Sequence, residues 1–263
     1  MHYSDEAFEE IEMQYSELRF RRNELSLKVA FFAGRMGNER AKEYILHGVG
    51  RRLGLLERCI DKMFMLFPAN CMEQLTQSDR QDLVINLHAF LINIYGIIEN
   101  IGLALAYEND LIGNKSAQKL HEKKINLFNK RFQNLLNPKL KEYLTEDTIG
   151  KWYREYAKNY RDALAHRITP YVPPAALNDK EQLTFKNLDK ELQSLTYEKD
   201  LARIDAIQEE QASLGSSNPL FVHSFFEKAK LVYLHPQLIA DYRTVEEILM
   251  KALDNFNCAQ DDE

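Results

Sequence analysis

Arginine, aspartate and histidine occur close together in the segment Tyr160-Arg161-Asp162-Ala163-Leu164-Ala165-His166 of this 263-residue chain. A guanidinium can hold a phosphate through two parallel hydrogen bonds, and an imidazole can exchange a proton near neutral pH. A helix over this segment should end at Thr169-Pro170, because proline disfavours helical backbone in the residue before it. Arg161 and His166 are therefore candidates for phosphodiester chemistry near a helix end, with Asp162 as the polar neighbour of the arginine.

Spacing alone does not single out this pair. The chain has 15 arginines and seven histidines, and Arg40 and His47 form a second pair with a similar separation. Short patterns of this kind arise by chance. Arg40 is followed by the apolar Ala41 and lies early in an expected amphipathic helix, whereas Arg161 is followed by an acidic residue and His166 lies near a helix end. Context therefore favours the later pair.

The helical geometry of this pair indicates a dimer. Five residues along a helix turn through about 140° and rise about 7.5 Å. Arg161 and His166 should therefore flank a groove and not stack on one face. Two copies packed around a two-fold axis would bring both pairs into one cleft. We therefore expect a homodimer.

The rest of the sequence predicts an all-α fold, a bundle of long antiparallel helices. Ten glycines and seven prolines are few for this length, and apolar residues recur at steps of three and four, which is typical of amphipathic helices. We expect Asn38 to cap the second helix and Ser78, with Gln81, to cap the third. The expected helices cover about residues 5–32, 39–67, 79–107, 116–136, 140–144 and 146–168, with a final helix that opens at 236 and reaches Phe256.

Three regions follow from this pattern. Residues 1–177 form the helical bundle, with the core motif region at 78–171. Residues 178–217 form a charged helical arm and linker, with a break near Thr196-Tyr197. Residues 218–258 form a C-terminal segment and a helix that packs back on the bundle, and their apolar stretch over 221–234 fits either strand or helix.

Composition and charge limit the function. The net charge is −6, but residues 115–167 carry 13 basic and six acidic side chains. A locally positive surface can attract nucleic acid despite an acidic total, although a solvated lysine-rich helix face explains the same count. The three cysteines have no disulfide or zinc spacing, and no signal peptide or membrane-spanning run appears, which favours the cytoplasm and no membrane. The sequence predicts neither a metal site nor a cofactor.

The arrangement Arg161-Asp162-x-x-x-His166, late in a long helix of an all-helical chain, resembles the Rx4–6H signature of the HEPN superfamily. The flanking Trp152-Tyr153 and Ile168-Thr169-Pro170-Tyr171 look like a bacterial branch of it. The resemblance covers residues 78–171. It implies a dimeric helical bundle that cleaves RNA without a metal, in phage defence or a toxin–antitoxin system, together with an antitoxin or defence partner protein. Arg161, His166 and Asp162 would then be catalytic.

In the implied reaction the RNA 2′-hydroxyl attacks the adjacent phosphorus and leaves a 2′,3′-cyclic phosphate. RNA phosphates would contact Lys151, Arg154, Lys158 and Arg167. The alternative is a non-catalytic dimeric scaffold that docks a partner protein or a nucleotide. In that case residues 178–213 would be the docking arm. The remaining histidines at 47, 88, 121, 223 and 235 have no paired ligand spacing and are predicted to be structural or on the surface.

Overall fold

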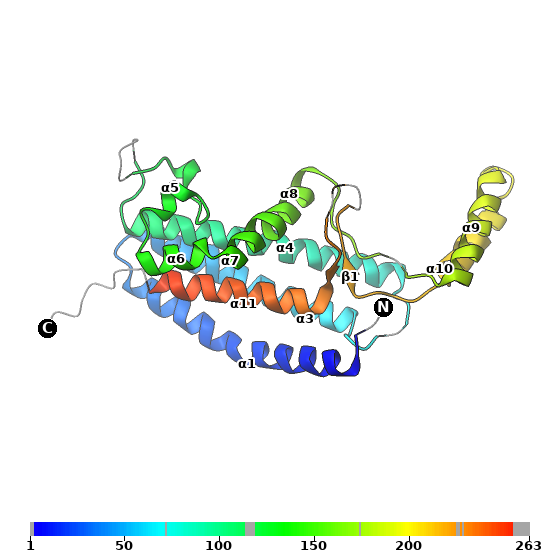
Figure 1. The fold of residues 1–263 in the computed structure, drawn as a ribbon, viewed down its shortest axis with the longest axis horizontal. Coiled ribbons are helices and arrows are strands. Elements are labelled where there is room, and N and C mark those ends of the chain that lie inside the picture. Colours follow the sequence, from blue (N-terminus) through cyan, green and yellow to red (C-terminus); the bar gives the residue numbers. More distant parts are fainter. Residues whose placement is uncertain are drawn as a thin grey trace.

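Long helices lying side by side form the body of the protein. The computed structural model describes residues 3–71, 73–113, 119–173, 175–224, 227 and 229–254. The four long helices of the bundle are α1 (Asp5–Arg35), α3 (Arg51–Leu66), α4 (Gln77–Glu108) and α11 (Leu234–Leu253). Figure 1 shows α3 running opposite to the other three. The described chain is mostly helical, as predicted.

Side-chain caps set the starts of the first two helices. Ser4 accepts a hydrogen bond from Ala7 N at the start of α1. Asn38 accepts from Arg40 N and Ala41 N, as predicted, and opens a continuous rod of α2 (Glu39–Glu43), η1 (Tyr44–Gly50) and α3. The middle segment η1 is a π-helix, which the regular apolar spacing did not indicate. A π-helix widens the turn locally, and such segments often occur at functional sites.

The third helix begins two residues earlier than the sequence indicated. Thr76 is the N-cap of α4 and accepts from Asp79 N at 3.1 Å, so the predicted Ser78–Gln81 capping box is wrong. Both residues can cap a helix, and the apolar pattern inside the helix does not distinguish between them.

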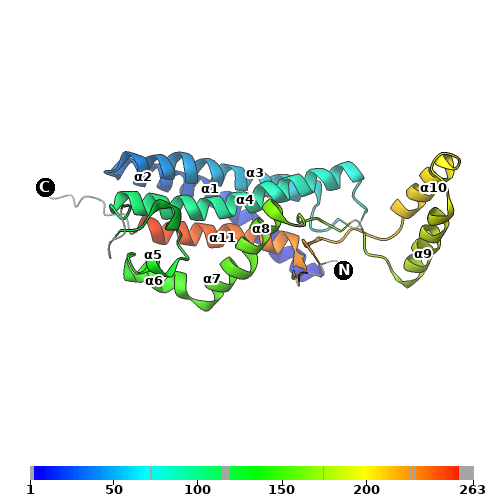
Figure 2. The same ribbon diagram turned by 90° about the horizontal axis from the view of Figure 1, so that it is seen from above.

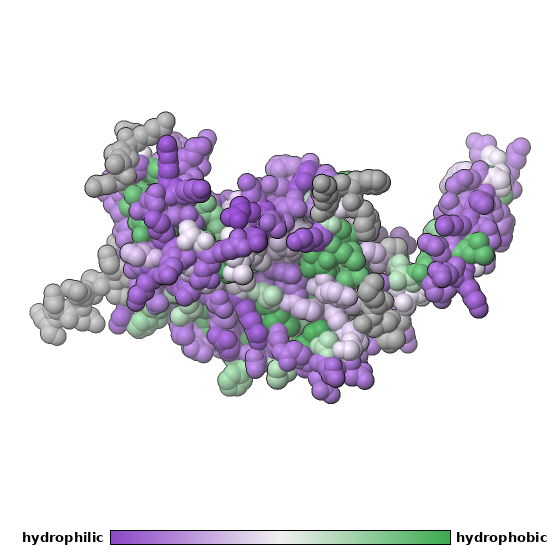
Figure 3. All heavy atoms as spheres, in the orientation of Figure 1, coloured by the Kyte–Doolittle hydropathy of each residue, from purple (hydrophilic) through white to green (hydrophobic). Residues whose placement is uncertain are grey.

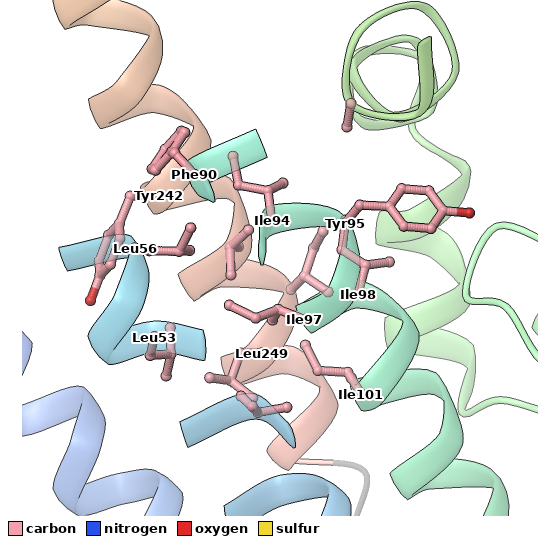
Figure 4. Close-up of a cluster of buried hydrophobic side chains, with 14 of the residues drawn as sticks. Leu53, Leu56, Phe90, Ile94, Tyr95, Ile97, Ile98, Ile101, Tyr242 and Leu249 are labelled. Atoms are coloured by element: carbon pink, nitrogen blue, oxygen red, sulfur yellow. The ribbon is translucent and has the colours of Figure 1, made fainter. Parts of the chain in front are cut away.

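The core gathers around α4. Figure 4 shows its isoleucines packed among side chains of α3 and α11. Fully or almost fully buried core residues from these three helices include Leu53, Leu56, Phe90, Ile94, Ile97, Ile98, Ile101 and Leu249. Burial of apolar surface on several sides of α4 explains why this helix is apolar nearly all round.

The predicted helix over 116–136 is wrong where the structure describes it. Residues 114–118 lie outside the described residues, and the segment after them holds only the 3-10 turn η2 (Glu122–Lys124) and the short α5 (Lys130–Gln133). The Asn126 side chain accepts from Phe128 N, and Asn129 accepts from Arg131 N and Phe132 N. These asparagines satisfy local backbone donors, which favours turns over a continuous helix.

The next helices lead to the segment with the arginine and histidine. They are α6 (Pro138–Thr145), α7 (Asp147–Lys151), the π-helix η3 (Trp152–Ala157) and α8 (Lys158–His166). The long helix predicted over 146–168 is thus present, with a π-helical middle. In Figure 2, α8 lies beside α4, on the other side of that helix from most of α3.

The charged region forms a helical hairpin of α9 (Asp179–Ser194) and α10 (Leu201–Ala212), broken where predicted. Figures 1 and 2 show this arm projecting from one end of the bundle, and Figure 3 shows its mainly hydrophilic surface. After it, β1 (Leu220–Phe221) pairs antiparallel with β2 (Val232–Tyr233). The two ends of the 221–234 stretch, which fitted either strand or helix, thus include strand residues. Helix α11 starts two residues before Pro236, and Phe256 lies outside the described residues.

Candidate active site on α8

A buried carboxylate anchors the chain just before α8. Asp241 of α11 accepts hydrogen bonds from Trp152 Nε1 at 2.8 Å and from the Tyr156 hydroxyl at 2.7 Å. Gln237 Nε2 donates a third bond at 2.7 Å. Burial away from water raises the pKa of Asp241 to about 7, although these three donors act in the opposite direction. Two side chains one turn apart on η3 are thereby fixed to α11, and α8 continues from η3.

The inner face of α8 is packed and its end is well defined. Tyr160 and Ala163 are buried, and the Tyr160 hydroxyl donates to the Lys230 carbonyl at 3.0 Å. The helix ends at His166, and Arg167 N donates back to the Ala163 carbonyl at 2.9 Å. The predicted site therefore lies on the last turns of a helix whose position is fixed by tertiary contacts.

The Arg161 guanidinium is held against an aromatic ring of the central helix. Its Cζ lies 4.0 Å from the centroid of the Tyr95 ring, and its Nη1 lies 3.1 Å from Asp162 Oδ1. The side chain is 23% exposed, and its buried Nε has no hydrogen-bond partner among the described residues. A guanidinium over an aromatic face is stabilised electrostatically. Arg161 is thus held in place, and its side chain as a whole is only partly exposed.

Tyr95 itself belongs to a series of stacked rings that the sequence did not reveal. Figure 4 shows it pointing from α4 toward the segments that carry η3 and α8, away from Leu53 and Leu56. Tyr153 lies beside it, with ring centroids 5.9 Å apart, and stacks in turn on Phe128 at 3.8 Å. The advance signal was a tyrosine with a polar tip in a mainly apolar stretch of α4.

His166 is exposed, in contrast to Arg161. Its side chain forms no hydrogen bond or ion pair with another residue of the described ranges. Arg161 faces Tyr95 of α4, whereas His166 is exposed at the helix end. The groove between them and their convergence on one phosphate through a second copy remain predictions.

The basic side chains predicted for RNA binding are used in different ways. Arg154 and Lys158 are exposed and line a hollow of about 440 Å³ together with Asp162 of the candidate site. Lys151 does not line this hollow, and its Nζ pairs with Asp147 at 2.6 Å. Two of the predicted phosphate contacts are thus brought beside Asp162, and a third lies apart from it.

Arg167, the fourth predicted contact, holds the structure around the helix end. Its guanidinium pairs with Glu227 at 2.8 Å and donates to Asn159 Oδ1 at 2.6 Å. Asn159 also lies 3.3 Å from Nε2 of the buried His223, whose pKa is lowered, first by burial and then by the nearby Arg167. Arg167 therefore ties the end of α8 to the segment that follows β1.

Three of the remaining histidines have structural roles, as predicted. Besides His223, His88 of α4 lies 2.6 Å from the Pro170 carbonyl and fixes the chain just after α8. His235 lies 2.6 Å from the Phe67 carbonyl, and burial lowers its pKa to about 4. His88 and His223 therefore hold the chain around the end of α8.

No protein-family model matches the chain, and no curated protein and no solved structure matches it either.

No group of histidine, cysteine and carboxylate side chains within the described ranges is arranged to hold a metal ion. Among those residues one helix, α4, is long and apolar enough to cross a membrane, but 67% of its most apolar window is buried in the bundle. The apolar side chains in that window therefore serve mainly to pack α4 into the bundle.

Proposed function

We propose that the protein is a HEPN-like, metal-independent endoribonuclease that acts as a homodimer in the cytoplasm. The observation that carries the proposal is the difference between the two side chains on α8. Arg161 is held by Tyr95 and Asp162 with its side chain partly exposed, and His166 is exposed at the helix end. A fixed cation and an accessible proton-transfer group are what phosphodiester cleavage requires.

In the proposed reaction, the RNA 2′-oxygen bonds to phosphorus while the bond from phosphorus to the 5′-oxygen breaks. His166 of one copy takes the 2′-hydroxyl proton, and a water molecule in the shared cleft gives a proton to the departing 5′-oxygen. Arg161 stabilises the negative charge that grows on the phosphoryl oxygens. The products are a 2′,3′-cyclic phosphate and a 5′-hydroxyl, and a 2′-deoxy strand cannot react. Arg154 and Lys158 would attract the strand.

The test is incubation of the purified chain with mixed RNAs in EDTA, followed by analysis of the ends. Wild-type protein should leave cyclic phosphate ends, and His166→Ala should leave the RNA intact. RNA that carries a 2′-O-methyl group at the cleaved position should resist. Cleavage of DNA, or equal cleavage by His166→Ala, would contradict the proposal.

The shared cleft has its own test. Arg161→Ala and His166→Ala should each be inactive, and mixing them under conditions of subunit exchange should restore part of the activity, because a mixed dimer holds one intact arginine and one intact histidine. Light scattering should give twice the 30.8 kDa chain mass. A monomer that cleaves RNA would disprove the shared cleft but not the nuclease.

The second candidate is a non-catalytic scaffold that docks a partner protein. The partner would be the antitoxin or defence protein that the family resemblance implies. The observation that favours it is the projecting arm, where Leu183, Tyr197 and Leu201 expose large apolar side chains. Failure of wild-type protein to cleave any RNA, with a stable dimer by light scattering, would favour the scaffold.

A further inference from the structure

The second arginine–histidine pair lies in a cleft of its own, outside the candidate active site. Arg40 is in α2 and His47 in the π-helix η1, and both line a cleft of about 510 Å³ between this rod and α4. Arg51 and Arg52 at the start of α3 also line it. Three arginines and a histidine from one continuous rod therefore face one hollow.

Close packing of the rod on α4 shapes this cleft. A Cβ atom at Gly48 would lie 2.8 Å from Asn100 Cγ, and one at Gly96 would lie 2.6 Å from Arg52 Cζ. Both distances are shorter than carbon contacts in proteins allow. The two glycines therefore permit Asn100 and the Arg52 guanidinium to lie directly against the neighbouring backbone.

Arg52 is fixed in position before any ligand arrives. Its Nη1 donates to Asn93 Oδ1 at 2.7 Å, and the buried Asn93 donates its own amide to the Ala89 carbonyl at 2.7 Å. Arg40 is likewise restrained, with its Cζ 4.6 Å from the centroid of the Tyr107 ring. Two of the three guanidinium groups are therefore pre-organised, which lowers the entropy cost of binding.

The charge in the cleft is not balanced within the described chain. None of Arg40, Arg51 and Arg52 forms an ion pair with a described residue, and Glu43 is the single acidic side chain among the lining residues. Like charges collected in one cleft create a field that concentrates anions. Guanidinium groups match the oxygens of a phosphate in geometry as well as in charge.

We propose that this cleft binds a small phosphorylated molecule that also carries hydroxyl groups. Its volume is in the range of small-molecule sites. The arginines would hold the phosphate, and the Glu43 carboxylate and the Asn100 amide would bind hydroxyls. The cleft is separate from Arg161, which packs on Tyr95 on another side of α4, so this proposal does not depend on RNA cleavage.

The test is calorimetric titration at low salt with ribose 5-phosphate, adenosine 5′-monophosphate, inorganic phosphate and, as the uncharged probe, ribose. We expect saturable binding of one or both esters, weaker binding of inorganic phosphate and none of ribose. Arg51→Glu and Arg40→Glu should each weaken ester binding about tenfold or more, which corresponds to one lost charged contact. The matched control is Arg58→Glu, an exposed arginine on α3 outside the cleft, which should leave affinity unchanged.

Several results would overturn the proposal. These are no saturable binding of either ester, equal affinity for the esters and inorganic phosphate, and equal loss in Arg58→Glu. Circular dichroism should show that the variants are folded. His166→Ala should bind the ester like wild type, which separates this result from the fate of the nuclease proposal.

Discussion

The two arginine–histidine pairs of this chain show how much tertiary contact decides when spacing does not. Each pair lies in a rod that includes a π-helix, η3 before Arg161 and η1 after Arg40, and both arginines face an aromatic ring of α4, Tyr95 for Arg161 and Tyr107 for Arg40. Arg161 has an acidic partner and a histidine at a helix end, whereas Arg40 has further arginines beside it and a histidine inside the helix. The first arrangement suits proton transfer at a phosphodiester, and the second suits capture of an anion.

The largest expected effect separates the two histidines. His166→Ala should lower RNA cleavage about 10²–10⁴-fold, the usual contribution of a general acid or base, while His47→Ala should leave the rate near wild type. Initial rates on one RNA at equal enzyme concentration measure this. Equal losses in both variants would remove the distinction between the pairs.

The next effect concerns the contact that holds the π-helix η3, which is the buried side chain of Asp241. Asp241 has a folded-state pKa of about 7 against an ordinary value of 3.8. Between pH 4 and pH 7 the unfolded chain has lost this proton and the folded chain keeps it. The contribution of Asp241 to stability is therefore full below pH 4 and is lost as the pH rises toward 7.

Asp241→Asn should remove this dependence, because an amide stays neutral and can still accept from Trp152. The free energy of unfolding of the variant should gain on wild type between pH 5 and pH 7 by up to about 1.4 kcal/mol per pH unit. Urea denaturation at pH 5, 6, 7 and 8 measures the difference, which should level off above 7. A difference in unfolding free energy that stays constant across this pH range would contradict the raised pKa of Asp241.

The anchor of η1 is steric, and a pair of glycines tests it. Gly48→Ala should destabilise the fold by about 1–3 kcal/mol, because the new methyl group would meet Asn100. Gly54→Ala is the matched change, since nothing lies within 4 Å of its Cβ position in α3. It should stabilise the protein by up to about 1 kcal/mol through helix propensity. Thermal and urea unfolding of both variants give the comparison.

The smallest expected effect concerns the ring beneath Arg161. Tyr95→Leu should reduce RNA cleavage about tenfold or less, because it removes the aromatic face and leaves an apolar side chain. Tyr95→Phe keeps the face and should retain most of the activity. If the two variants lose activity equally, the face of the ring does not position Arg161. Unfolding curves should accompany the rates, since Tyr95 is buried.

Much of the architecture could be read from local patterns. The apolar stripes predicted the long helices, Asn38 was recognised as a cap, and the break near Thr196 was placed between α9 and α10. These features depend on neighbours within a few turns, so periodicity and capping residues report them directly. The helix predicted over residues 116–136 was wrong after residue 118, because turns formed by Asn126 and Asn129 override a weak helical tendency.

The sequence by itself determined that this chain is helical and that Arg161 and His166 lie at the end of a helix. Only the tertiary structure decided that Arg161 rests on Tyr95, that Asp241 fixes η3, and that three arginines share a cleft beside α4. The partners in each of these contacts are separated by dozens of residues or belong to different helices. No short-range pattern encodes them, because side-chain periodicity sets which face of a helix is apolar but not which helix it meets.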